Sequence, residues 1–399
     1  NRNKYLVLKL NFSSVATTLE QLEQKFNAYC KMVMRAFAKD NSHLLGEDIV
    51  EELEKYDTAD EVLGFLCLSA QNKRLKMYLI LDEYDNFANN ILVDYGNERY
   101  HSITHGNGFF RGFLKVVKDY SNSVIERIFL TGVSPVTMDD LTSGFNIADN
   151  YSSNSVFNNM IGFNEYEVRT LIDYYKSRTE LPHTTDELIG IMKPWYDNYC
   201  FSTKSLDEPS MYNSDMVLYF MNRYLLNRHI PDNMLDANIR TDYNKLRHLI
   251  HVDKTFGENA SVVQEIVENG STTGIIADSF PAEDIVKPRN FKSLLYYYGM
   301  LTISGMEMGE PVLSVPNWAV REQLYGYMAD IYKDTANLYL EIDKLIDLMK
   351  RMAYKGEWEN YFRYIADRLN GQSSIRDFIE GEAYVKTFIL SYLGLTHYY

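Results

Sequence analysis

Two adjacent carboxylates, Asp82 and Glu83, follow directly after the apolar run Met77–Leu81. This pattern is typical of a buried parallel strand that ends in acidic residues. Open α/β sheets bind ligands at the carboxyl ends of their strands, so the pair stands where a ligand would lie. An Asp in that place can help to hold Mg²⁺, and a neighbouring Glu can polarise an attacking water. The alternative is a surface or structural acidic pair that has no chemical role.

A second strand-like run, 127–131, ends in the polar residue Thr131, which Gly132 follows. P-loop ATPases of the additional-strand class need a polar residue at this place, termed sensor 1, to contact the γ-phosphate or the attacking water. Thr131 fits that role, although an ordinary strand-end hydrogen bond would explain Thr131 alone. The carboxyl ends of parallel strands share one rim of a sheet. The acidic pair and Thr131 together therefore favour a Walker B element with a sensor more strongly than the pair or Thr131 does alone.

One part of a nucleotide site is missing from this sequence. No G-x-x-x-x-G-K-[ST] motif occurs in the 399 residues. Such a loop supplies the backbone N–H groups that cradle phosphates and the lysine that neutralises them. We therefore expect weak ATP binding, or none, from the sequence as it stands. The sequence starts at Asn1 without a Met, which suggests an excised or processed chain whose loop lies further upstream.

The elements that must position these side chains alternate between strands and helices. Strands are predicted where aliphatic residues run between turn signals, and helices where apolar residues recur three and four positions apart. This alternation implies crossover connections in a mostly parallel sheet, and therefore an α/β fold. The predicted strands are 5–12, 77–82 and 127–131, and the predicted helices are 18–38, 58–72 and 107–120.

The remainder of the chain is predicted to be mainly helical, with one hairpin. Residues 134–162 are rich in Ser, Asn, Asp and Gly, and we expect an ordered functional loop. Residues 253–290 are polar and interrupted by Gly and Pro, as at a boundary between domains. Residues 290–329 predict a helix, a hairpin and a helix, either a winged-helix-like unit or a helical subdomain with a protruding hairpin. Further helices are predicted at 164–178, 184–195, 214–227, 242–252 and 336–369, and another begins around Glu380–Glu382.

Composition narrows the class of protein. The net charge of −15 and the pI near 5.1 count against a uniformly basic nucleic-acid binder, although a local basic groove remains compatible with them. The sequence has no apolar run of about 18 residues, which predicts no transmembrane helix. No signal-peptide pattern precedes the first strand, so we predict a cytoplasmic protein. Three widely spaced cysteines, Cys30, Cys67 and Cys200, predict idle thiols in a reducing compartment.

The order of motifs along the chain resembles a known family, the bacterial AAA-ATPase-like proteins that are commonly joined to a PD-(D/E)XK nuclease domain. Each motif is moderately specific, their order is highly specific, and they extend over nearly the whole chain. The motifs that carry the resemblance are Leu79–Asp85, Leu130–Pro135, Asp139–Phe145, Trp195–Phe201, Tyr212–Asp215, Gly299–Thr302 and Val315–Arg321.

The resemblance implies an α/β P-loop-type sheet flanked by helices, then a helical lid and a winged-helix-like unit. The ATPase-like core, without its Walker A loop, would occupy 1–180 and the lid 181–285. The winged-helix-like unit would occupy 286–335. A helical segment at 336–399 would be the possible start of the nuclease domain, whose metal-binding strands would follow Tyr399.

The resemblance also implies ATP and Mg²⁺ as cofactors. Asp82 would hold Mg²⁺ through water, Glu83 would orient the attacking water, and Thr131 would act as the sensor. Glu382 is implied as an early acid of the nuclease site, and the alternative is an ordinary acid at a helix N-terminus. The residues implied near the nucleotide are Asp82, Asp85, Ser134, Tyr212 and Asn213.

Two functional hypotheses from different classes follow. The first is an ATPase module whose turnover, in the intact protein, is coupled to an attached nuclease or another nucleic-acid-directed activity. The second is a catalytically incomplete ATPase fold that binds protein or DNA. A nuclease acting alone is disfavoured, because no D…(D/E)xK pair follows Glu382. The expected partners are ATP, nucleic acid through the C-terminal domain, and a protein or further copies of the chain, but no membrane. Whether the chain is itself an enzyme is left open.

Overall fold

The computed structural model describes residues 4–15, 19–133, 148–236, 258–285, 287–370 and 382–396. The chain divides into two compact units. The first unit comprises Asn1–Asp149 with Ala277–Ile285, and the second comprises Asn150–Ile276 with Val286–Tyr399. This division does not test the four domains expected from the sequence, which stay a prediction.

The first unit is built on a parallel sheet of three strands in the order β1-β2-β3. The strands are β1 (Leu6–Asn11), β2 (Met77–Asp82) and β3 (Ile125–Leu130). Leu6 pairs with Met77 and Asn11 pairs with Asp82, so the first two strands end in register. The predicted α/β fold with a parallel sheet is confirmed, and the run that leads into Asp82 is a strand with the predicted bounds.

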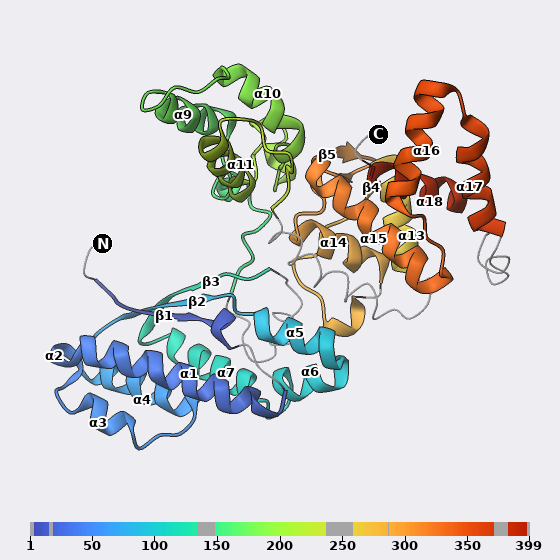
Figure 1. Cartoon of the computed structure of the whole chain (residues 1–399). Helices are drawn as coiled ribbons and strands as arrows, with labels where there is room; N and C mark the ends of the chain where they lie inside the picture. The colour runs from blue at the N-terminus through green and yellow to red at the C-terminus, as the bar shows by residue number, and fades with distance from the viewer. Residues whose placement is uncertain are drawn as a thin grey trace. The chain divides into compact units, whose positions relative to one another are not determined.

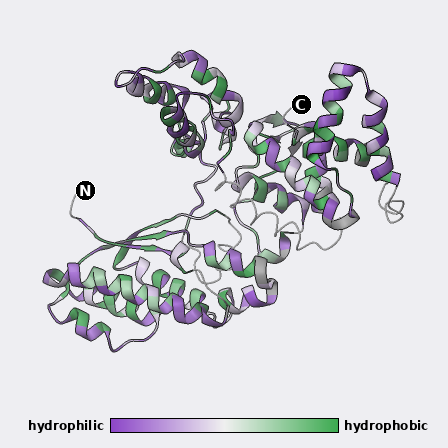
Figure 2. Cartoon of the chain, viewed as in Figure 1, coloured by the Kyte–Doolittle hydropathy of each residue, from purple (hydrophilic) through white to green (hydrophobic). Residues whose placement is uncertain are grey.

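Helices pack on one face of this sheet. The three longest are α1 (Leu19–Asp40), α4 (Ala59–Asn72) and α7 (Phe109–Ser121), and they lie on the same side of the strands (Figure 1). Each carries both hydrophobic and hydrophilic residues, as expected when one side of a helix is buried (Figure 2). The shorter helices of the unit are α2 (Ser42–Leu45), α3 (Ile49–Leu53), α5 (Asn86–Tyr95) and α6 (Asn97–Thr104).

Aliphatic and aromatic side chains fill the space between helices and sheet. Alternate residues of β1 and β2 are buried, among them Leu8 and Leu79. Beyond β1 lies an aromatic cluster in which Phe12 packs edge-on against Phe110, with ring centroids 5.8 Å apart. Two cysteines predicted to be idle, Cys30 and Cys67, are buried thiols, and burial raises the pKa of the second to about 12.

The opposite face of the sheet presents the other alternate residues of the strands. It is formed by Val7 and Lys9 of β1, Tyr78 and Ile80 of β2, and Phe129 of β3, which the strand register brings side by side. Val7 is 51% exposed and Phe129 is 42% exposed. Parallel sheets are normally covered on both faces, so such exposure of apolar side chains on one of them is unusual.

The second unit begins with a small helical cluster. Its helices are α9 (Glu165–Lys176), α10 (Thr185–Tyr196) and α11 (Ser214–Asn227), all close to their predicted positions. Capping boxes begin the first two, because Asn164 and Thr184 each pair with a Glu three residues later. Val168, Met192 and Phe220 belong to the hydrophobic core that these helices share. The helix predicted at 242–252 lies outside the described residues.

The middle of the second unit combines helices with an antiparallel sheet in the order β4-β6-β5. The predicted hairpin is present as β5 (Thr302–Glu307) and β6 (Glu310–Ser314). Its third strand, β4 (Ser271–Thr273), has only three residues and was not predicted. The helices of this part are α13 (Glu258–Asn269), α14 (Pro288–Tyr297) and α15 (Trp318–Ala336).

Three more helices complete the described chain. They are α16 (Ile342–Lys355), α17 (Trp358–Asn370) and α18 (Glu382–Gly394). Gly356, with a φ angle of 72°, ends α16, so the helical region predicted over 336–369 contains two helices, α16 and α17. In the portion of the chain that the structure describes, no helix has the length and apolar content needed to cross a bilayer.

Candidate functional site

The ends of β2 and β3 bring Asp82 and Thr131 together. The Thr131 hydroxyl donates a hydrogen bond to Oδ1 of Asp82, 2.5 Å away. The Thr131 backbone N–H donates to the carbonyl of Leu81 at 2.9 Å, so the sheet itself sets this distance. Sequence reasoning placed the two side chains on one rim of the sheet, and there they are in contact.

Two residues of β1 also bind Asp82, and neither was among the residues predicted for the site. Asn11 Nδ2 donates to Oδ2 of Asp82 at 3.1 Å, and Lys9 Nζ lies 3.1 Å from the same oxygen. The signal that could have found them is the register of β1 against β2, which pairs Asn11 with Asp82. Residues two apart on a strand point to the same face of the sheet, so Lys9 lies on the same face as Asn11.

These donors act on the acidity of Asp82. The Thr131 hydroxyl, followed by the Lys9 ammonium, lowers the pKa of Asp82 from its ordinary value, against a smaller opposing effect of burial. Both donors favour the charged form, because they bind a carboxylate more strongly than a carboxylic acid. Asp82 is therefore an ionised, partly exposed carboxylate at neutral pH.

Glu83 has a strained backbone. Its φ angle is 55°, in the left-handed region that residues with a Cβ adopt at a cost of about 1–2 kcal/mol. The half-buried side chain accepts a hydrogen bond from Asn86 Nδ2 at 3.2 Å, which fixes the carboxylate beside the start of α5. Strained residues cluster at functional sites, where the surrounding structure holds them in place. Nothing in the sequence signals this strain, since no glycine marks the position.

Asp85 anchors the chain that leaves β3. Its side chain is fully buried, and its two oxygens each lie 3.2 Å from the N–H of Val133. Asn89 donates to Oδ2 at 2.7 Å. A Cβ on Gly132 would collide with the ring of Tyr84 and the carboxylate of Asp85, so only glycine fits between them. These contacts are structural, and a role of Asp85 toward a nucleotide stays a prediction.

Three of the other predicted site residues belong to the second unit. Tyr212 belongs to the second unit, where its ring is buried in the core of the helical cluster. Asn213 caps α11 by accepting a hydrogen bond from the N–H of Met216. Glu382 is exposed at the first residue of α18. Ser134 lies outside the described residues, and none of the four assignments is tested by these positions.

The carboxylate of Asp82 is a group that Mg²⁺ could use as a ligand. This cation prefers one or two carboxylates and keeps several of its waters, rather than entering a cage of protein ligands. No cluster of three or more His, Cys, Asp or Glu suited to a metal ion is found where the structure is described. The side chain of Asp82 is 29% exposed, so solvent reaches the carboxylate. A phosphate cradle is not part of this group of residues.

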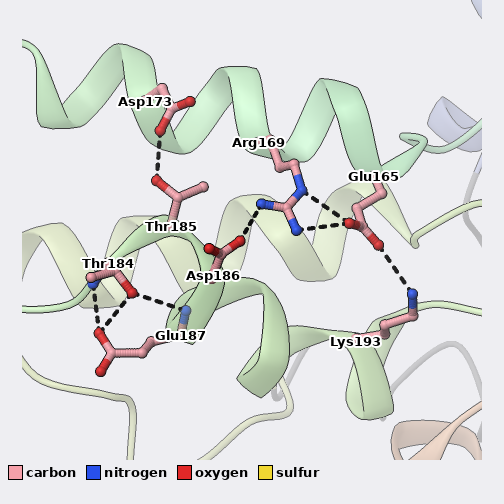
Figure 3. Close-up of polar contacts among 8 residues, drawn as sticks. All are labelled: Glu165, Arg169, Asp173, Thr184, Thr185, Asp186, Glu187 and Lys193. Carbon is pink, nitrogen blue, oxygen red and sulfur yellow. Dashed lines mark hydrogen bonds and ion pairs between the residues drawn. The ribbon is translucent and has the colours of Figure 1, made fainter.

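A second group of charged residues joins α9 to α10 (Figure 3). Arg169 binds Glu165 on its own helix at 2.9 Å and Asp186 on α10 at 2.6 Å. Lys193 binds the other oxygen of Glu165 at 3.0 Å, and Lys193 and then Arg169 lower the pKa of this carboxyl. Thr185 donates to Asp173 at 2.6 Å, again from one helix to the other. This group is called the interhelix network below.

Comparison with known proteins adds one finding. Residues 1–142 match the model of a family described as predicted AAA-ATPase. No curated protein matches the chain. No solved structure matches it either. The match includes all three strands of the parallel sheet and the residues at their carboxyl ends, which supports an ATPase-like module in this part of the chain.

Proposed function

We propose that this chain carries the catalytic strand ends of an AAA-like ATPase and that the intact protein binds and hydrolyses ATP with Mg²⁺. The observation that carries the proposal is the hydrogen bond from Thr131 to Asp82 at the ends of neighbouring parallel strands, with Glu83 next to it. All three residues fall inside the range that matches the ATPase family.

Each residue has a role that its contacts support. Asp82 is kept ionised by its donors, and it would hold the hydrated cation through a metal-bound water. Glu83 would orient the attacking water and accept its proton, from a carboxylate that Asn86 steadies. Thr131 fixes the orientation of Asp82 and would sense the γ-phosphate. When bound with ATP, Mg²⁺ would neutralise the charge that develops on the phosphate oxygens.

The direct test is nucleotide binding and hydrolysis by the complete protein. We expect ATP with Mg²⁺ to raise its melting temperature, because a ligand that binds the folded state stabilises it. Glu83→Gln should retain this shift while phosphate release falls by about 10²–10⁴-fold. Glu126→Gln, an exposed acid of β3 in the same sheet, is the matched control and should hydrolyse normally. No shift with ATP and unchanged release in Glu83→Gln would refute the proposal.

A second candidate, an interaction module, is favoured by one part of the second unit. The order α13, β4, α14, β5, β6 and α15, with β6 between β4 and β5, supports a winged-helix-like unit. Met308, in the turn of the hairpin, is fully exposed. Residues 302–314 contain Glu307 and Glu310 but no Lys or Arg, which favours a protein partner over nucleic acid for the hairpin. Robust hydrolysis that Asp82→Asn abolishes would remove this alternative as the main function.

The remaining assignments belong to the same proposal. The helical lid, the coupling of ATP turnover to an attached nuclease and the metal-binding role of Glu382 rest on the resemblance of the sequence motifs. Glu382→Ala in the complete protein tests the last of these, because it should abolish metal-dependent DNA cleavage while ATP hydrolysis continues. Cleavage at the rate of the unmodified protein would contradict the role of Glu382.

A further inference from the structure

Asp82 is nearly saturated with hydrogen-bond donors. Its Oδ1 accepts from Thr131, and its Oδ2 faces both Asn11 and Lys9 at 3.1 Å. A carboxylate offers about four lone-pair sites, so these donors occupy most of them. A hydrated cation that used Asp82 would have to bind at the remaining position or displace one of the three donors.

The three donors are not equally fixed. Thr131 is held by its backbone hydrogen bond to β2. Asn11 is held from its other end, because its Oδ1 accepts from the N–H of Ser13 at 2.9 Å and from the Ser13 hydroxyl at 2.6 Å. Lys9 reaches Asp82 only through a flexible four-carbon stem, and its side chain is 60% exposed.

Lys9 is also the only one of the three that carries a positive charge. Its ammonium lies where a divalent cation bound through the same carboxylate oxygen would approach, and two cations there would repel each other. An exposed ion pair of this kind is weak, so its rupture is readily reversible.

We propose that Lys9 acts as an exchangeable cation on Asp82, which occupies the carboxylate while the site is empty and leaves it when Mg²⁺ with nucleotide binds. Lys9 thereby sets the Mg²⁺ concentration at which the site fills. This inference rests on the proposed function, since it concerns the same carboxylate and the same cation.

The size of the effect follows from the weakness of the pair. An exposed ion pair is populated only about two- to fivefold over its broken state. Removing the ammonium should therefore lower the cation concentration for half-saturation by about two- to fivefold. The occupied site should otherwise be unchanged, because Asn11 and Thr131 still hold Asp82.

The experiment uses the complete protein and measures Mn²⁺ binding by electron paramagnetic resonance in the presence of a non-hydrolysable ATP analogue. Lys9→Met keeps an apolar stem and removes the positive charge, whereas Lys9→Arg retains the positive charge. Lys4→Met, which breaks the exposed pair of Lys4 with Glu126 on the same sheet, is the matched control. We expect tighter Mn²⁺ binding only in Lys9→Met, with a parallel fall in the Mg²⁺ concentration for half-maximal hydrolysis.

Equal or weaker Mn²⁺ binding by Lys9→Met, beside normal binding by the unmodified protein, would overturn this inference alone. Weaker binding of the analogue at saturating Mn²⁺ would also overturn it, because Lys9 would then contact the nucleotide. If the unmodified protein bound neither Mn²⁺ nor the analogue, the proposed function would fail and this inference with it.

Discussion

The strand ends around Asp82 and the interhelix network around Glu165 contain the same chemical groups but use them differently. In both, a partly exposed carboxylate is bound by a cationic side chain, and its pKa is lowered. The carboxylate of Glu165 connects regular helices, and no residue of 165–193, all described, has a positive φ angle. Asp82 instead ends a buried strand and precedes a residue in the left-handed region. Ion pairs alone therefore do not distinguish these two regions, which differ in the strand-end position of Asp82 and in the left-handed backbone at Glu83.

The largest difference in stability should come from glycine substitutions in the two regions. Gly132→Ala forces a Cβ against Tyr84 and Asp85, so we expect a loss of about 1–3 kcal/mol in the free energy of unfolding. Gly190→Ala, in α10 with open space around its Cβ, should raise it by about 0.5–1 kcal/mol. Urea unfolding measures both, and a Gly132→Ala protein as stable as the parent would contradict the close packing after β3.

A smaller effect should reveal the strain at Glu83. Glu83→Gly and Glu83→Ala both remove the carboxylate, but only Gly adopts a positive φ angle without cost. We therefore expect the Gly variant to be more stable than the Ala variant by about 1 kcal/mol. At Asp186, in the first turn of α10, the Ala variant should instead be the more stable of the two, because a helix favours Ala over Gly. If thermal melts showed Glu83→Ala to be as stable as Glu83→Gly or more stable, Glu83 would not be strained.

The smallest effects should come from titration, where the two regions behave alike. Asp82 and Glu165 have folded pKa values below their ordinary values of 3.8 and 4.5. At a pH above its ordinary pKa, each carboxylate therefore stabilises the folded state. This stabilisation is lost as the pH falls through the folded pKa. Because both are partly exposed, each contribution should be less than about 1 kcal/mol. Asp82→Asn and Glu165→Gln should each reduce the loss of stability on acidification. Acid unfolding curves identical to that of the parent protein would contradict the lowered pKa values of these carboxyls.

Sequence reasoning placed Asp82 and Thr131 on one rim of the sheet, because both residues end apolar runs and parallel strand ends share a rim. The hydrogen bond between them was not predicted. Sequence reasoning did not reach Lys9 and Asn11, because the neighbour of β2 in the sheet depends on chain topology and not on a local pattern. The fixed position of Asp85 depends on where the chain turns after β3, which brings the N–H of Val133 to its carboxylate. The strand β4 escaped prediction because three residues are too few to show an alternation.

The measurement that tests the central claim most directly compares one substitution from each region in the complete protein. Asp82→Asn and Glu165→Gln each neutralise one ion-paired carboxylate, and ATP hydrolysis with Mg²⁺ is followed by phosphate release. If the strand ends form the catalytic site, Asp82→Asn should lose about 10²-fold or more of the rate while Glu165→Gln stays close to the parent. Equal rates in the two variants, near that of the parent, would contradict the assignment of catalysis to the strand ends.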